Sequence, residues 1–324
     1  MAARRSALAV WLNPATILIG SVLGYMDPLF ALPAVAALVT AVNGWPTLAG
    51  ALIAAAGLTK PQAIFVAPAV ALAIWNVGDR RDAWRRSAAA SGGATMVAVA
   101  AIGPIVAHGA FWNMIWGLGS LTRDAFLSGN ACNLWWLSDY LRHVTSSMHS
   151  MSVWAAAMQP AELEPILPAV KLDPFRVVGL MLTFVASGWA IRQARRARDL
   201  WLLSAVGAFL VHAYATLAVS VHENHLFAAV PLLALASAGR PRFVPIFMTV
   251  SAIMALNLNL FYGIGSEMGY AIPRGITILD ATVVLAMVNC ATFVWHATVL
   301  KGECSPARQK VHSSLVGCTV DHSS

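Results

Sequence analysis

The sequence predicts an all-α integral membrane protein, polytopic, with about ten transmembrane or re-entrant helices and one long outer loop. Of the 324 residues, 59% are hydrophobic and only 11% are charged, which is too few charges for a soluble domain of this length. The mean hydropathy is +0.69. Apolar runs repeat along the chain between short basic or Gly/Pro-marked turns, a pattern typical of helices. A barrel would instead show short alternating segments.

The apolar runs define the expected spans. They lie at 6–24, 28–42, 46–59, 62–77, 89–107, 174–191, 200–220, 226–238, 243–262 and 275–299. The first run contains Asn13-Pro14 and is followed by no convincing cleavage site, so we expect a first span and not a signal peptide. The runs at 28–42, 46–59 and 226–238 are shorter than the roughly 20 residues that cross the hydrocarbon. We expect these three to be tilted, broken or partly re-entrant.

The spans divide the chain into four parts. These are N-terminal membrane helices (1–107), an outer aromatic loop with interfacial helices (108–172), C-terminal membrane helices (173–300) and a disordered cytoplasmic tail (301–324). The loop is rich in Trp and Met, which favours amphipathic helices at the membrane surface. A connection of this length is uncommon unless it is functional or disordered, and its aromatic content argues against disorder.

The basic residues predict the orientation. The formal net charge is +7, but the basic residues fall in loops between spans, so we read them as topogenic and expect no nucleic-acid partner. If both termini are cytoplasmic, 15 of the 21 Lys and Arg residues lie on the cytoplasmic side. The other six are Lys60, Arg123, Arg142, Lys171, Arg176 and Arg274. We therefore expect a multi-pass protein, of the plasma membrane if it is bacterial, with membrane lipids around it.

The segment His222-Glu223-Asn224-His225 joins two apolar runs without a polar linker. Ionisable groups at membrane depth cost roughly 2.5–3.5 kcal/mol each, so they are seldom tolerated without a partner or a task. The two histidines would share one face if a helix begins there. Three interpretations stay open: binding of a phosphate or a sugar, a structural cap or buried hydrogen-bonded pair, and a metal site. Metal is the weakest, because the segment is not HExxH and no third ligand is evident.

Four segments together resemble the GT-C superfamily of integral-membrane glycosyltransferases. They are Leu12-Asn13-Pro14 running on to Gly24-Tyr25-Met26-Asp27-Pro28, then Leu58-Thr59-Lys60-Pro61-Gln62, then Asn130-Ala131-Cys132-Asn133-Leu134-Trp135-Trp136, and Val221-His222-Glu223-Asn224-His225-Leu226-Phe227. The Lys-Pro-Gln junction is similar to that of bacterial mannosyltransferase-like members. Each segment is weak alone, and their order over residues 11–238 makes the combination moderately specific.

The resemblance implies transfer of a hexose, mannose or glucose, from a polyprenyl-phosphate donor to a glycan, lipid or protein acceptor at the periplasmic or lumenal face, without a cofactor. The family's best-known acidic motif lies on an outer loop ahead of anything matched here. We expect that the chain is a fragment, has a misplaced start, or is a divergent member. The family's general base therefore transfers to no residue of this sequence. The open alternatives are a sugar or lipid transporter (a flippase) and a non-catalytic membrane subunit.

Candidate residues follow from what this chemistry needs. A carboxylate must take the acceptor proton, for which Asp27 and Glu223 are candidates, although Asp27 precedes Pro28 and is equally placed to cap a helix. Cations stabilise the leaving phosphate, and aromatic rings stack on sugars. The proposed substrate-binding residues are His222, His225, Lys60, Gln62, Arg123, Arg142, Trp135 and Trp136. Lys60 would equally snorkel to headgroups, and interfacial anchoring is the default for the arginines and tryptophans. We expect His212, inside a span, to bond between helices.

Overall fold

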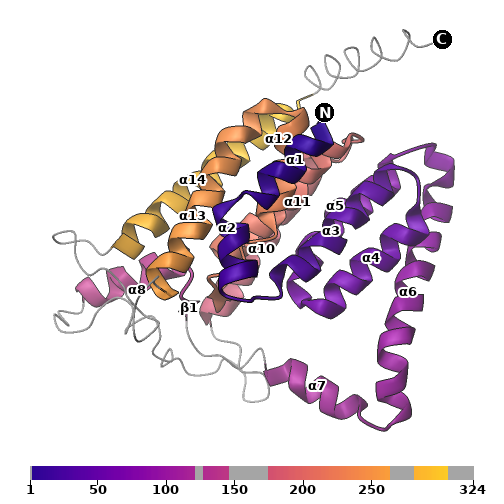
Figure 1. The fold of residues 1–324 in the computed structure, drawn as a ribbon, viewed down its shortest axis with the longest axis horizontal. Helices are drawn as coiled ribbons and strands as arrows, with labels where there is room; N and C mark the ends of the chain where they lie inside the picture. The colour runs from indigo at the N-terminus through magenta and orange to yellow at the C-terminus, as the bar shows by residue number, and fades with distance from the viewer. Residues whose placement is uncertain (1, 121–126, 146–173, 263–280, 306–324) are drawn as a thin grey trace.

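The computed structural model describes residues 2–120, 127–145, 174–262 and 281–305, and the regular secondary structure in these ranges is helical apart from two strands of two residues each (Figure 1). The elements before the outer loop are α1 (Ala2–Trp11), α2 (Pro14–Thr16), η1 (Ile17–Val22), α3 (Asp27–Val42), α4 (Pro46–Thr59), η2 (Pro61–Phe65), α5 (Ala67–Asn76), η3 (Arg80–Asp82) and α6 (Ala83–Ala107). The rest are α7 (Phe111–Ser120), β1 (Ser128–Gly129), α8 (Leu134–Thr145), α10 (Pro174–Gln193), α11 (Leu200–Leu217), β2 (Val221–His222), α12 (Ala229–Gly239), η4 (Pro241–Phe243), α13 (Val244–Tyr262) and α14 (Ala281–Glu303). The all-α prediction is confirmed.

Among the described residues, five helices are long and apolar enough to cross a membrane. They are 80–107, 174–193, 200–217, 241–262 and 281–303. Four further apolar helices, at 27–42, 46–59, 61–76 and 229–239, are shorter. The prediction of a polytopic membrane protein is supported at this coarser level.

The predicted first span is not one continuous helix. It divides into α1, the short α2 and the π-helix η1. Asn13 causes the first break, because its side-chain oxygen accepts a hydrogen bond from the Ala15 amide (2.9 Å) and caps α2. Its Nδ2 donates to Ser251 Oγ of α13 (2.8 Å), so the break is tied to the far half of the chain. A π-helix at this place widens the turn that leads to Tyr25 and Asp27.

Helix α11 forms the centre of the fold. Of its 18 residues, 78% are buried, and it packs against α10, α12, α14 and α5. His212 lies fully buried in it and bonds to Asn289 of α14 (3.1 Å), which confirms the inter-helix prediction. In contrast, only 11% of the residues in an apolar 18-residue stretch of the helix at 80–107, and 17% in such a stretch of α10, are buried. These two helices present apolar surface to the outside.

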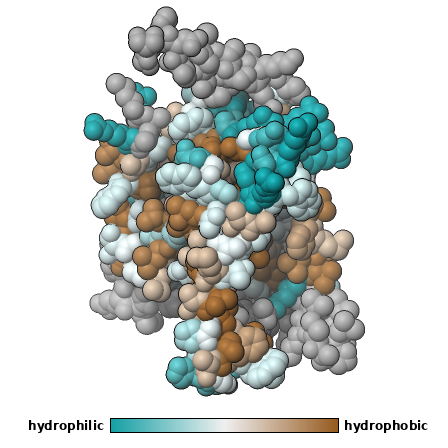
Figure 2. All heavy atoms as spheres, turned by 90° about the vertical axis from the view of Figure 1, so that its right-hand side faces the viewer, coloured by the Kyte–Doolittle hydropathy of each residue, from teal (hydrophilic) through white to brown (hydrophobic). Residues whose placement is uncertain are grey.

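The helices have two polar ends. At the end that we call the basic end, η3 and the start of α6 carry Arg80, Arg81 and Arg85, and hydrophilic residues gather in the upper part of Figure 2 above a largely apolar middle. Arg240 is buried at this end and donates to Glu303 (2.6 Å) and Asp199 (2.9 Å), which joins α11, α12 and α14. Asp199 raises the pKa of Arg240 further, although burial opposes that shift. The opposite end, which we call the site end, holds the start of α3, the end of α4 and the strand pair (Figure 1).

Candidate functional site

The four segments noted in the sequence meet at the site end. Lys60 and Asn224 both contact Asp27, Gln62 contacts His225, and β1 pairs with β2 in parallel register, Ser128 with Val221 and Gly129 with His222. Residues nearly 200 positions apart therefore form one polar cluster where several apolar helices end. The predicted set is largely brought together.

Asp27 is a buried, fully engaged carboxylate. Its exposed fraction is 1%, Oδ1 accepts from Lys60 Nζ (2.7 Å) and Oδ2 accepts from Asn224 Nδ2 (3.0 Å). The helix-cap interpretation is wrong, because α3 begins at Asp27 itself, and the residue in the cap position, Met26, makes no side-chain cap. Lys60 is also held over the Phe30 ring (5.6 Å). The ion pair fixes the end of α4 to the start of α3.

Glu223 has two different carboxylate oxygens. Oε1 accepts from Tyr262 (2.6 Å) and lies 3.0 Å from Tyr25 Oη, which is in turn 2.7 Å from Tyr262 Oη. Burial raises the pKa of Tyr25 to about 12, so its hydroxyl stays a donor near neutral pH. Oε2 is buried and makes no hydrogen bond to any described residue, although His222 Nδ1 lies within ion-pair distance at 4.0 Å. Glu223 therefore has one oxygen held in place and one available.

His225 is buried between polar neighbours. Its Nδ1 accepts from the His222 amide (3.3 Å) and lies 3.0 Å from Tyr214 Oη, and its Nε2 lies 2.9 Å from Gln62 Nε2. Burial holds the pKa of His225 well below its usual range, and the charges of Lys60 and His222 lower it further. A ring that stays neutral acts by hydrogen bonding and supplies no charge to a phosphate.

The prediction that His222 and His225 share a helix face is wrong. Val221 and His222 form β2, and α12 begins only at Ala229. The rings still lie 5.5 Å apart, because the turn after β2 folds His225 back toward His222. Pairing with β1 excludes a helix here, since the Glu223 amide donates to Gly129 O (3.2 Å).

The loop at 127–133 that carries β1 is held in an unusual backbone. Asn130 in this loop and Ser220, which lies opposite Leu127 across the pair, have positive φ values of 62° and 57°. Non-glycine residues rarely adopt this region, and such positions concentrate at functional sites. Asn133 ends the loop by capping α8, accepting from the amides of Trp135 (3.0 Å) and Trp136 (3.1 Å).

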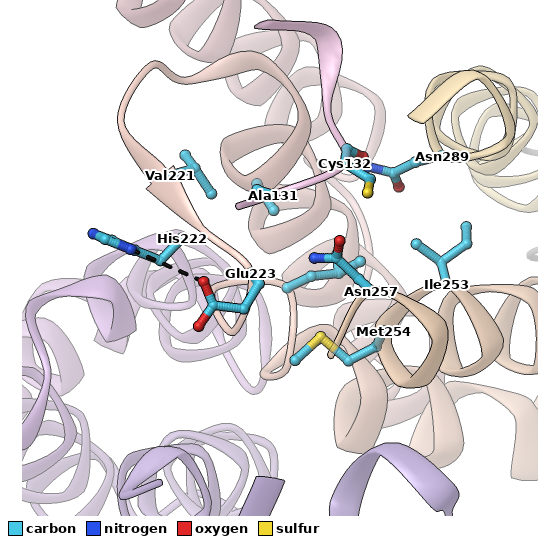
Figure 3. Close-up of a pocket in the computed structure, with 11 residues that line it drawn as sticks. Ala131, Cys132, Val221, His222, Glu223, Ile253, Met254, Asn257 and Asn289 are labelled. Carbon is cyan, nitrogen blue, oxygen red and sulfur yellow. Dashed lines mark hydrogen bonds and ion pairs between the residues drawn. The ribbon is translucent and has the colours of Figure 1, made fainter. Parts of the chain in front are cut away.

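A small pocket opens beside Glu223, at the junction of the 127–133 loop, β2, α13 and α14 (Figure 3). Glu223, Asn257 and Met254 line one side of it, and Cys132 and Asn289 lie together on the other (Figure 3). Asn257 is 5% exposed, and its Oδ1 makes no hydrogen bond within the described part of the chain. The pocket thus offers two buried acceptor oxygens, from Glu223 and Asn257, to a donor such as a hydroxyl group.

The two tryptophans occupy positions that differ from those expected for sugar stacking. Trp135 is 5% exposed, donates Nε1 to Leu217 O (2.7 Å) and meets the Phe175 ring. Trp136 is fully buried, donates Nε1 to Thr282 Oγ1 (2.9 Å) and meets Phe261. A ring without an exposed face cannot stack on a sugar, so these residues pack α8 against α11 and α14.

The remaining predicted residues are the two arginines. Arg123 lies outside the described residues, and Arg142 lies in α8 without a described side chain. Among the residues that the structure does describe, no group of three or more His, Cys, Asp or Glu side chains could hold a metal ion.

Sequence reasoning missed the residues that complete the cluster. Tyr25, Tyr214 and Tyr262 hold Glu223 and His225, and Asn257 faces the pocket. Tyr25 was visible two residues before Asp27, and Tyr262 was visible as a polar group at the end of an apolar run. Nothing in the sequence placed Asn257 of α13 beside Glu223.

Comparison with known proteins adds no family to this geometry. No family model matches the chain, and neither a curated protein nor a solved structure matches it significantly.

Proposed function

We propose that the protein is a membrane glycosyltransferase that transfers a hexose, mannose or glucose, from a polyprenyl-phosphate donor to a hydroxyl-bearing acceptor. The observation that carries the proposal is the state of Glu223. It is a buried carboxylate with one oxygen fixed by tyrosine hydroxyls, while the other lies beside a pocket without a hydrogen bond from any described residue. That arrangement suits a base that must receive a proton from a positioned hydroxyl.

In the proposed reaction, the acceptor hydroxyl lies in hydrogen-bond contact with Glu223 Oε2. Its oxygen attacks the anomeric carbon, its proton passes to Oε2, and the bond between the anomeric carbon and the phosphate oxygen breaks. The polyprenyl phosphate leaves with the electron pair and needs no protonating acid. Lys60, with a side chain 21% exposed, and His222, at 44%, lie at the accessible edge of the cluster as candidates to stabilise the developing charge.

Asp27 has a supporting part in this proposal. Both of its oxygens are occupied, by Lys60 and by Asn224. It therefore orients the lysine and the turn after β2 and does not accept a proton from substrate. This assigns different roles to the two carboxylates that the sequence left as equal candidates.

The proposal includes a topology. The four shorter apolar helices and the broken N-terminal segment join the five long helices to make about ten crossings, with both termini in the cytoplasm. The site end then faces the periplasm or lumen. Lipid-facing α6 and α10 leave apolar surface for the membrane and for a polyprenyl chain.

The test is a transfer assay in membranes with labelled polyprenyl-phosphate mannose and glucose. Glu223→Gln keeps the shape and removes the base, so we expect a loss of transfer of about 10²–10⁴-fold. His222→Ala should have a smaller effect. Asp82→Asn, an exposed carboxylate at the basic end, is the control and should retain full transfer.

Two results would contradict the proposal. Undiminished transfer by Glu223→Gln would remove the residue from the chemistry. Folded wild-type protein that transfers sugar from neither donor, yet moves a lipid or a sugar across the bilayer, would make it a transporter.

A further inference from the structure

A chain of buried polar side chains runs from the protein interior to the wall of the pocket. Asn289 Nδ2 donates to the Cys132 carbonyl (2.9 Å), Asn289 Oδ1 lies 3.1 Å from His212 Nε2, and His212 Nδ1 lies 3.3 Å from His296 Nδ1. His212 and His296 are fully buried, and Asn289 is 3% exposed. Asn289 reaches the pocket wall beside Cys132, whereas His212 and His296 lie deeper and have no part in the site described above.

The Cys132 carbonyl determines the directions of the hydrogen bonds that Asn289 makes to Cys132 and to His212. A backbone carbonyl can only accept, so the Asn289 amide must turn its nitrogen toward Cys132 and its oxygen toward His212. That oxygen can only accept, so His212 carries its proton on Nε2. In a neutral ring Nδ1 is then an acceptor, and it faces His296 Nδ1 at 3.3 Å. The orientation of the Asn289 amide and the tautomer of His212 are therefore fixed together.

The Cys132 carbonyl, which accepts the hydrogen bond from Asn289, belongs to the loop that positions Glu223. Residues 127–133 supply the partner of β2, and Gly129 O accepts from the Glu223 amide (3.2 Å). Ala131 and Cys132 also form part of the pocket wall beside Glu223 (Figure 3). With two positive-φ residues in and opposite the loop, this backbone needs external support to keep its conformation.

We infer that His212 and Asn289 are positioning residues, which hold the 127–133 loop, and through it β2 and Glu223, in the geometry of the pocket. The inference concerns how the pocket is built and is independent of the reaction proposed above. Its physical basis is that His212 fixes the orientation of the Asn289 amide. Without that contact the amide is free to rotate away from Cys132, and the 127–133 loop loses the hydrogen bond from Asn289 that ties it to α14.

The test uses the accessibility of Cys132, whose side chain is buried in the intact pocket wall. A variant with Cys290, Cys304 and Cys318 replaced by alanine leaves this single thiol, and its rate of reaction with a small maleimide reports opening of the loop. The informative pair is His212→Gln and His212→Asn. Both side chains are amides, but only glutamine places a donor where Nε2 of histidine lies.

We expect His212→Gln to label at close to the rate of the three-alanine parent. His212→Asn should label about tenfold faster, because the loss of one buried hydrogen bond shifts a local opening equilibrium by about that factor. Ser204→Ala is the matched control, since Ser204 is buried in the same helix but bonds only to Leu200 O within it (2.7 Å), and should not change the rate.

Two results would overturn the inference: labelling of His212→Asn at the parent rate, or equal acceleration in the Gln and Asn variants. Both measurements are made without substrate, so failure of the sugar-transfer assay has no bearing on them.

Discussion

At the scale of single residues, the ion pair of Asp27 and Lys60 is a principal contact of the site, because it joins the start of α3 to the end of α4. Asp27 is 1% exposed, and Lys60 reaches it from the end of α4 at 2.7 Å. Such a pair adds little compared with an apolar pair, because both charges must lose water. Removing one partner is costly, because it leaves the other charge buried alone.

This asymmetry gives a double-mutant prediction. Lys60→Met should destabilise the protein by about 2–3 kcal/mol, toward the lower end of values for buried pairs because Lys60 is partly exposed. The double variant Asp27→Asn/Lys60→Met should regain much of that loss, since no unpaired charge remains. Thermal unfolding in detergent measures both. Equal loss in the single and double variants would show that the pair is not coupled.

At the scale of elements, α4 and α6 pack backbone to backbone through glycine. A Cβ added to Gly93 would lie 2.0 Å from Thr47 O, and one added to Gly50 would lie 1.8 Å from Ala90 O. Only residues without a side chain allow this approach, and small residues drive helix association where water supplies no hydrophobic force. The helix α4 that presents Lys60 is thereby fixed to the longest described helix.

Neighbouring glycines of α6 provide the test. Gly93→Ala should destabilise by about 1–3 kcal/mol, the range for overpacking. Gly92→Ala places its Cβ in open space, so it should be neutral or slightly stabilising through its helix propensity. Unfolding temperatures of the two variants under one detergent condition measure the difference. Similar temperatures for both would contradict the close α4–α6 contact.

At the scale of the whole molecule, the two polar ends differ in charge. The basic end carries exposed arginines at η3 and the buried Arg240 network, and the site end carries the paired Lys60 together with Asp27 and Glu223. Positive charge favours the cytoplasmic side. The proposed function therefore depends on which side the site end faces.

Labelling of single cysteines tests this orientation. In a cysteine-free chain, His222→Cys at the site end should react with a membrane-impermeant maleimide added outside intact cells. Arg81→Cys at the basic end should react only after permeabilisation. The reverse pattern would place residues 222–225 in the cytosol and would remove the glycosyl-transfer proposal.

Much of the architecture followed from local chemistry. Apolar runs predicted the helices, and the polar segment at 222–225 indicated the site end, but the break of the first run at Asn13-Pro14 was not predicted. The sequence failed where pairing overrode local pattern. His222 entered a strand because β1 lies beside it, and Trp135 and Trp136 turned inward because Asn133 caps α8 and fixes their direction.

The sequence by itself determined the class of the molecule, because hydrophobicity and charge are properties of each residue and its neighbours in the chain. It also identified Asp27, Lys60, Gln62, Glu223 and His225 as candidate site residues. Only the tertiary structure decided their partners. It placed Tyr262 on one oxygen of Glu223 and left the other oxygen beside a pocket, a difference that no sequence pattern encodes. The physical reason is that the state of a buried carboxylate depends on the donors around it, and here those donors, Tyr25 before α3 and Tyr262 at the end of α13, lie far apart in the sequence.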